Sequence, residues 1–230
     1  MFIRFSIRLT HVMKIILLTL LFFILLSFSF CDTHSVANNH LSKKETADSL
    51  KIADSIEYQK LIIKAREAFD FCKKKKMNTD ICLLLNYHKH SGLTRFYVWD
   101  FKLQKAIDSG MVSHGCGPNL WGHDDSKTHP VFSNTYESHC SSIGKYKIGD
   151  RGYSNWGIHV NYAMHGLDST NSNSYGRQIC MHGWDMVEDI ESYPDGTPEG
   201  WGCAAVSNAF MTRLDALLNE RKGVLLWGFI

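Results

Sequence analysis

The chain has 230 residues, 44% of them hydrophobic, which is enough to bury the core of one ordinary domain but not of two large ones. Its 25 basic and 23 acidic residues leave a formal net charge of +2. Binding to a polyanion needs a strongly basic surface, so nucleic acid is not an expected partner.

The N-terminus has the pattern of an export signal. Basic residues occur within the first fourteen positions, and a nearly unbroken apolar run follows over 15–30. This run is shorter than the roughly 20 residues of a spanning helix, which favours a signal peptide over a permanent anchor. Cys31 leaves lipid attachment as an alternative. We expect residues 1–31 to send the chain to the periplasm or cell envelope, with membrane contact only through this segment.

A linker and a helical extension are expected next. Residues 32–46 are polar and lack periodicity, which is typical of a tether. Over 47–78 the spacing of apolar residues predicts one or two amphipathic helices packed on the domain. The apolar positions are Leu50, Ala53, Ile56, Leu61, Ala65, Ala68 and Phe69.

A period of two then predicts strands at 81–85, 95–101 and 106–113, the last two joined by a polar turn around Lys102. The stretch 115–150 is rich in Gly, Ser, Asn, His and Pro and has little apolar periodicity. It predicts a long ordered loop, the kind of segment that often forms binding sites.

Strand patterns return at 157–164 and 178–181. Ser207 has the position of an N-cap for a helix that Gly223 ends, and 224–230 predicts a closing strand. The apolar face of that helix consists of Phe210, Leu214, Leu217 and Leu218. The elements together predict a mainly β domain of the α+β or sandwich type, with a few helices.

Seven cysteines in an exported chain favour disulfide formation. Cys72 with Cys82 and Cys116 with Cys140 are the expected pairs, although the sequence alone does not determine the disulfide connectivity. An odd number of thiols leaves at least one cysteine free.

Two segments contain a candidate catalytic pair. His182 stands where a short strand runs into a glycine, which holds its imidazole at the sheet edge. Cys203 follows Gly202 and precedes two alanines at the expected start of a helix, where unpaired N–H groups lower a thiol pKa. A cysteine nucleophile needs such a site and a base. Spacing alone also fits a buried structural cysteine and a hydrogen-bonded histidine.

Eight short segments occur in a recognisable order: Arg95–Asp100, Val112–Gly115, Phe132–Asn134, Ser138 with Ser141–Gly144, Gly166–Asp168, Asn171–Asn173, Arg177–Gly183 and Gly202–Val206. In these segments the chain resembles the murein L,D-transpeptidase catalytic domain of the YkuD type, in the branch with tryptophan before Gly-Cys. The resemblance implies a transpeptidase-like β-sandwich over 79–230, and neither a metal nor another cofactor is expected.

The resemblance also implies a reaction. Peptidoglycan stem peptides would be the partner, and Cys203 would carry the acyl group as a thioester with His182 as its base. The Gly183 carbonyl would orient the imidazole, and the N–H groups of Gly202 and Cys203 would stabilise the oxyanion. Cross-linking and L,D-carboxypeptidase activity both fit this chemistry.

Substrate contacts are expected from three further side chains. Trp184 and Trp201 flank the catalytic positions, and Ser142 lies in a segment, 132–144, that is a candidate lid. The tryptophans also fit plain core positions.

The chain departs from the family pattern beside the cysteine. Gly200 and Trp201 replace the Ser/Thr-His of the wider family, and Glu199 stands where the related branch has a basic residue. An acid close to the thiol opposes its ionisation unless it points away. A wall-binding protein with a degenerate site is therefore an alternative interpretation.

Ser113-His114-Gly115-Cys116 reproduces the wider family's cysteine motif literally. More than 100 residues follow it, and the upstream histidines lie in a polar turn, so we interpret Cys116 as structural. A papain-like amidase has the opposite order of cysteine and histidine. A zinc site is a weaker alternative, because no recognised ligand spacing occurs. Its candidate ligands are His114, Cys116, His123, His129, His159 and His165.

Overall fold

A computed structural model describes residues 55–118 and 125–230. The expected export signal, linker and first part of the helical extension lie outside these ranges. The chain divides after Tyr58, and residues 59–230 form one compact unit. No helix within the described ranges has both the length and the apolar character needed to cross a membrane.

Strands dominate the described residues. A helix over 55–75 comes first, in agreement with the predicted extension, and α3 (Asn208–Leu218) comes near the end. The other elements, in chain order, are β1 (Ile81–Asn86), β2 (Phe96–Asp100), β3 (Lys105–Gly110), the short 3-10 helix η1 (Asp125–Lys127), β4 (Gly144–Tyr153), β5 (Val160–Gly166), β6 (Cys180–Gly183), β7 (Ala204–Val206) and β8 (Leu225–Phe229).

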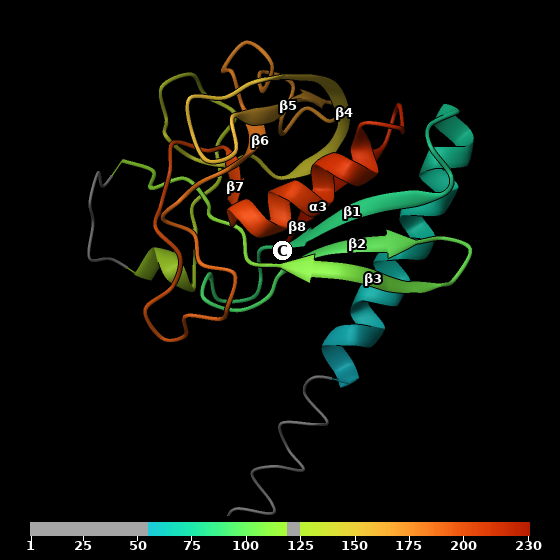
Figure 1. Ribbon diagram of the computed structural model, residues 1–230, viewed down its shortest axis with the longest axis horizontal. Helices are drawn as coiled ribbons and strands as arrows, with labels where there is room; N and C mark the ends of the chain where they lie inside the picture. The colour runs from blue at the N-terminus through green and yellow to red at the C-terminus, as the bar shows by residue number, and fades with distance from the viewer. Residues whose placement is uncertain (1–54, 119–124) are drawn as a thin grey trace, which may run out of the picture. The chain divides into compact units, whose positions relative to one another are not determined.

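The eight strands form one mixed sheet in the order β3-β2-β1-β8-β4-β5-β6-β7 (Figure 1). Two neighbouring pairs, β1 with β8 and β6 with β7, are parallel, and the others are antiparallel. The last strand of the chain therefore joins the hairpins of the first half to those of the second. The expected mainly β, α+β class with a helical extension is confirmed.

β1 is buried on both sides. Its alternate residues Leu83 and Leu85 belong to the core cluster that contains Phe210 of α3. Cys82 and Leu84 belong to a second cluster with residues of the N-terminal helix, which passes behind β2 and β3 in Figure 1. Because side chains alternate along a strand, the two helices cover opposite faces of the sheet. A strand covered on both faces is apolar throughout, as the run Ile-Cys-Leu-Leu-Leu is.

The predicted loop at 115–150 is wrong in its last part, since β4 begins at Gly144. β4 buries only Tyr146 and Ile148, and its second half carries Gly, Asp and Arg, with a register shift between Ile148 and Arg151. Such a strand has no sustained apolar alternation for a sequence pattern to detect.

The two predicted disulfides are also wrong. Cys72 and Cys82 pack in one cluster without a disulfide, and no disulfide joins Cys116 to Cys140. Burial raises the pKa of Cys72 to about 11 and raises that of Cys82 further above its ordinary value, so both stay protonated. All six cysteines within the described residues are reduced.

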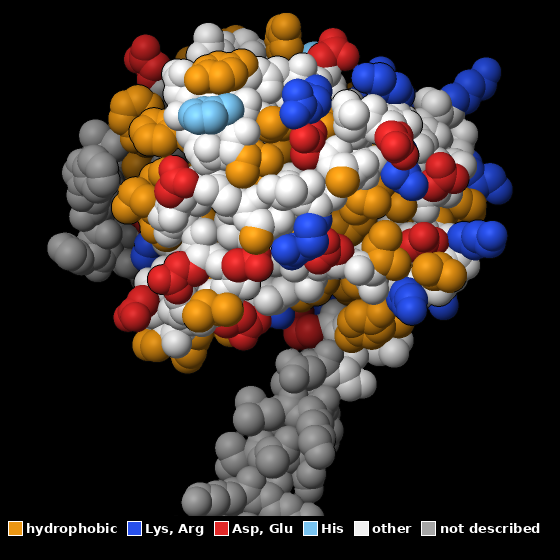
Figure 2. Space-filling view, in the orientation of Figure 1, with side chains coloured by type: hydrophobic (Ala, Val, Ile, Leu, Met, Phe, Trp, Pro, Cys, Tyr) orange, Lys and Arg blue, Asp and Glu red, His pale blue; other side chains and the backbone are white. Residues whose placement is uncertain are grey.

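The surface has no area dominated by one sign of charge on the face drawn in Figure 2, where basic and acidic side chains are interspersed with apolar ones. This distribution agrees with the net charge of +2.

Candidate active site

His182 is held at the end of β6 in a defined orientation. Met181 points into the core and is fully buried, so the alternation of the strand turns His182 toward the other face. The imidazole is 8% exposed, and its Nδ1 donates a hydrogen bond to the Gly183 carbonyl at 2.8 Å. This bond assigns the proton to Nδ1 in the neutral ring and leaves Nε2 as the basic nitrogen.

Cys203 lies beside His182 because of the parallel register of β6 and β7. Met181 pairs with Ala204 and His182 with Ala205, so the residue before β7 lies next to Cys180. Cys203 therefore lies just before β7, two positions out of register with His182 on β6. The expected helix start at Cys203 is wrong: a three-residue strand follows it, and Ser207 caps α3 only after that strand.

A tight turn places the cysteine. Gly202 has a φ of +107°, and a Cβ on it would lie 2.5 Å from the Cys140 carbonyl oxygen, so only glycine fits here. The Ser141 hydroxyl donates to the Gly202 carbonyl at 3.1 Å and accepts from the Gly115 N–H at 3.1 Å. Ser141 thus joins the turn to two neighbouring segments of the chain.

The thiol and the imidazole change each other's pKa. Burial alone would lower the pKa of His182, but the Cys203 sulfur beside it raises that pKa above its ordinary value. The neighbouring Cys180, through its thiol and its backbone N–H, and in addition His182, hold the pKa of Cys203 well below its usual range despite burial. The arrangement therefore favours a thiolate beside a protonated imidazole.

Cys180 was missed as a site residue in the sequence. Its Sγ lies 3.8 Å from the Cys203 Sγ, and its backbone N–H donates to the same sulfur at 3.5 Å. A signal was present, because Cys180 and His182 are two residues apart in a predicted strand and so share a face. The sequence does not reveal the β6–β7 register, which brings Cys203 next to Cys180 and His182.

The two tryptophans are near His182 and Cys203 in sequence, and they differ in exposure. Trp201 is 67% exposed and its ring lies 4.7 Å from that of His139. Trp184 is half-buried, contacts Trp156 edge to face, and donates its backbone N–H to the Val206 carbonyl. Trp201 thus presents an open aromatic surface two residues from the thiol.

Ser142 is buried, with only 3% of its surface exposed. Its hydroxyl donates to the Ser133 carbonyl at 2.7 Å and accepts from Arg177 at 2.8 Å. Arg177 also donates to the Ser138 hydroxyl and to the Cys140 carbonyl. The segment 132–144 is thereby tied to the chain just before β6, and a substrate contact of Ser142 stays a prediction.

Glu199 points away from the thiol. Its carboxylate accepts a short hydrogen bond from Ser126 and lies 3.4 Å from the Lys127 ammonium and 3.6 Å from His114 Nε2. The side chain is 8% exposed. The carboxylate of Glu199 therefore has partners other than the Cys203 thiol.

The second cysteine motif, Ser113 to Cys116, forms part of the wall beside Cys203. The Ser113 N–H donates to the Ala205 carbonyl. The Cys116 N–H donates to the Gly200 carbonyl, and the Gly200 N–H donates to the His114 carbonyl. His114 is fully buried, with its Nδ1 2.9 Å from Arg95. These backbone contacts support the structural interpretation of this motif.

No group of three or more His, Cys, Asp or Glu side chains placed to hold a metal occurs within 55–118 and 125–230. His123 lies outside these ranges. His159 precedes β5 and stacks on Tyr153, while His165 lies on β5 and stacks on Tyr175.

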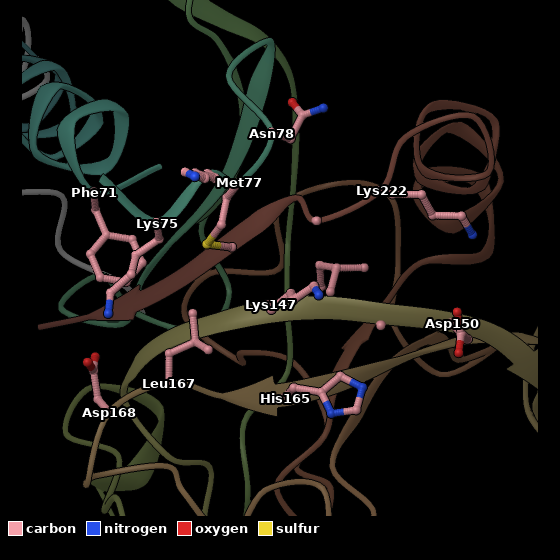
Figure 3. A pocket seen from close by; sticks show the side chains of 14 residues that line it. Phe71, Lys75, Met77, Asn78, Lys147, Asp150, His165, Leu167, Asp168 and Lys222 are labelled. Carbon is pink, nitrogen blue, oxygen red and sulfur yellow. The ribbon is translucent and has the colours of Figure 1, made fainter. Parts of the chain in front are cut away.

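A cavity of about 950 Å³ lies between the end of the N-terminal helix, β4, β5 and the turn before β8 (Figure 3). Lys75, Lys147, Lys222, Asp150 and Asp168 are among its lining residues. Neither His182 nor Cys203 lines it, so this cavity is not part of the candidate active site.

Comparison with protein families identifies one match. The model of the L,D-transpeptidase catalytic domain, of the YkuD type, matches residues 53–227. A comparison with curated protein sequences found no match.

Solved structures resemble the chain weakly. Pgp2, the helical cell shape determining protein of Campylobacter jejuni, is 14% identical with a TM-score of 0.40 over 64% of this chain and 46% of its own. Bd1075 of Bdellovibrio bacteriovorus is 12% identical with a TM-score of 0.42 over 67% and 49%. The L,D-transpeptidase of Xylanimonas cellulosilytica is 11% identical with a TM-score of 0.37 over 65% and 60%. The chain thus spans about half the length of the first of these structures.

Proposed function

This chain belongs to the family of L,D-transpeptidase catalytic domains, and we propose that it transfers acyl groups of peptidoglycan stem peptides with Cys203 as nucleophile and His182 as base. One observation carries the proposal. His182 donates from Nδ1 to the Gly183 carbonyl, which leaves Nε2 for a thiol that the β6–β7 register places beside it. The carbonyl has the orienting role that a carboxylate has in a serine triad.

In the first half of the reaction, the Cys203 thiolate attacks the carbonyl carbon at the L-centre of the third stem residue, a diamino acid. His182, already protonated by the thiol, gives its proton to the departing amine of the terminal D-alanine. The C–N bond breaks, and a thioester on Cys203 remains. The N–H groups of Gly202 and Cys203 stabilise the oxyanion of the tetrahedral intermediate.

In the second half, an amine or a water molecule attacks the thioester, and His182 takes up the proton of the attacking group. An amine from a second stem gives a cross-link, whereas water gives a shortened stem. We expect the exposed ring of Trp201 and the half-buried ring of Trp184 to contact the acceptor. The proposal includes export through residues 1–31, because the substrate lies outside the cytoplasm.

The test is incubation of the protein, purified from the envelope of an expressing bacterium, with tetrapeptide muropeptides, followed by mass spectrometry. We expect release of D-alanine, with either a cross-linked dimer or a tripeptide product. Cys203→Ala removes all product. Cys116→Ala is the matched control, because it removes the cysteine of the second motif and leaves product formation intact.

Two results contradict the proposal. Product formation that survives Cys203→Ala and is lost in Cys116→Ala assigns the chemistry to the other motif. Muropeptides that are bound but recovered intact by the folded wild-type protein indicate a wall-binding protein instead of an enzyme.

A further inference from the structure

We propose that Cys180 is a second catalytic thiol, whose S–H donates a hydrogen bond to the Cys203 sulfur and keeps it ionised. The proposal rests on the proposed function for its place in the reaction, but the interaction itself involves only groups of this chain. It adds a residue to the pair that sequence patterns predict.

The backbone aims Cys180 at the nucleophile. Cys180 begins β6, and the parallel register places it beside Cys203, one position before the Met181–Ala204 pair. The two sulfurs are 3.8 Å apart, within hydrogen-bond range for sulfur. The Cys180 N–H reaches the same sulfur at 3.5 Å, so one residue directs two donors at it.

The proton belongs on Cys180 when Cys203 is ionised. His182 interacts with Cys203, and an imidazole that accepts a proton from Cys203 leaves the negative charge on that sulfur. The hydrogen bond to Cys203, burial and the charge of the neighbouring thiolate all oppose ionisation of Cys180, so its pKa is raised. Cys180 is therefore the donor and Cys203 the acceptor, as in pairs of neighbouring thiols that share one proton.

The other groups around Cys203 do not replace this donor. The Gln178 carbonyl oxygen lies 3.8 Å from the Cys203 sulfur and opposes a negative charge there. Tyr87, after β1, is buried and stays protonated, since burial raises its pKa and the Cys203 charge adds to that rise. The His182 imidazolium is the cation beside the Cys203 thiolate. The neutral Cys180 thiol stabilises the same thiolate as a hydrogen-bond donor.

The hydrogen bond changes during the reaction. It is strongest to the thiolate of the resting protein and weakens when the sulfur becomes a neutral thioester. Cys180 therefore raises the fraction of reactive thiolate near neutral pH, where an ordinary cysteine with a pKa of about 8.5 is mostly protonated. Once the thioester is resolved, the donor again stabilises the leaving thiolate.

The test is the pH dependence of alkylation by iodoacetamide, with the adduct on Cys203 quantified by peptide mass spectrometry in the wild type, Cys180→Ala and Cys180→Ser. The alanine variant keeps the backbone N–H donor and removes only the thiol. We expect its alkylation midpoint to rise by about one pH unit, a tenfold change in the thiol–thiolate equilibrium. Cys180→Ser retains a hydroxyl donor and returns the midpoint toward that of the wild type.

Cys72→Ala is the control, because Cys72 is a buried cysteine in the other core cluster and its loss affects stability without touching the site. We expect the alkylation midpoint of Cys203 in Cys72→Ala to equal that of the wild type. An unchanged midpoint in folded Cys180→Ala overturns the proposal, and so does an equal shift in the alanine and serine variants. Alkylation needs no stem peptide, so a failed muropeptide assay with a shifted midpoint rejects the proposed function alone.

Discussion

Among single residues, three neighbours matter most to the proposed chemistry: His182 donates to the Gly183 carbonyl, and the β6–β7 register brings Cys203 beside the imidazole. These three residues were predicted together from the sequence. The role of Cys180 was not predictable, because it depends on a register between strands that are separated by 20 residues of irregular chain. The direction of Glu199 was equally hidden, since its partners Ser126 and Lys127 are distant in sequence.

His182→Gln tests the base directly. The variant keeps a polar side chain but has no basic nitrogen, so we expect D-alanine release to fall by about 10²–10⁴-fold. The alkylation midpoint of Cys203 rises as well, because the cation that stabilises the thiolate is lost. His165→Gln, on β5 beside Tyr175, is the control and leaves both quantities unchanged. Full activity of His182→Gln is incompatible with its proposed role.

Gly202→Ala tests the turn that places the nucleophile. A Cβ there meets the Cys140 carbonyl at 2.5 Å, and the residue has a φ of +107°. We expect a loss of about 1–3 kcal/mol in unfolding free energy and at least a tenfold lower rate of thioester formation. Gly200→Ala is the matched control, since the nearest atom to its Cβ is 4.0 Å away on Trp184. Equal effects of the two substitutions in stopped-flow acylation contradict this account.

At the scale of elements, predictability followed the strength of the local pattern. β1 and β2 are apolar runs and the helix α3 has a helical period, and each was predicted within a few residues. β4 and β7 were missed for different reasons. β4 alternates over only half its length, and β7 has three small residues after a glycine-rich turn, which suit a helix start equally well. The site thus depends on β7, the strand that local sequence propensity predicts least well.

The junction between α3 and the sheet predicts a pH dependence. Arg151 and Tyr162 donate to Asp215 of α3, and the pKa of Asp215 is lowered, chiefly by Arg151. A carboxyl with a lowered folded-state pKa adds stability above its unfolded pKa and loses it as the pH falls through the folded-state value. The difference in Tm between the wild type and Asp215→Asn therefore shrinks on acidification from pH 7 to below pH 4.

Asp150→Asn removes an exposed carboxylate from the same strand as Arg151 and is the control for net charge. Thermal scans across that range compare the two variants. A Tm difference for Asp215→Asn that stays constant with pH shows that the contact does not stabilise the folded state.

At the scale of the whole molecule, composition and element types predicted the class, but they did not predict the strand order. The order depends on long-range pairing, above all on the last strand entering beside the first, with β1 and β8 parallel. The two faces of β1 pack against different helices, so burial of one strand links both core clusters. β6, which holds His182, and β7, which follows Cys203, form one end of the same sheet.

Leu83→Ala tests the importance of this shared core. Leu83 is fully buried in β1, so we expect a loss of about 2–5 kcal/mol in unfolding free energy. Leu103→Ala is the control, because Leu103 is 56% exposed and its loss costs within about 0.5 kcal/mol. Denaturant unfolding measures both values. Similar small losses in the two variants place the stabilising core elsewhere.

Trapping with a carbapenem tests directly whether Cys203 accepts an acyl group. We expect an intact-protein mass increase equal to the mass of the β-lactam, located by peptide mapping on Cys203 and absent in Cys203→Ala. We also expect unchanged labelling in Cys116→Ala. An adduct on Cys116, or a folded protein that acquires no adduct at Cys203, contradicts the account.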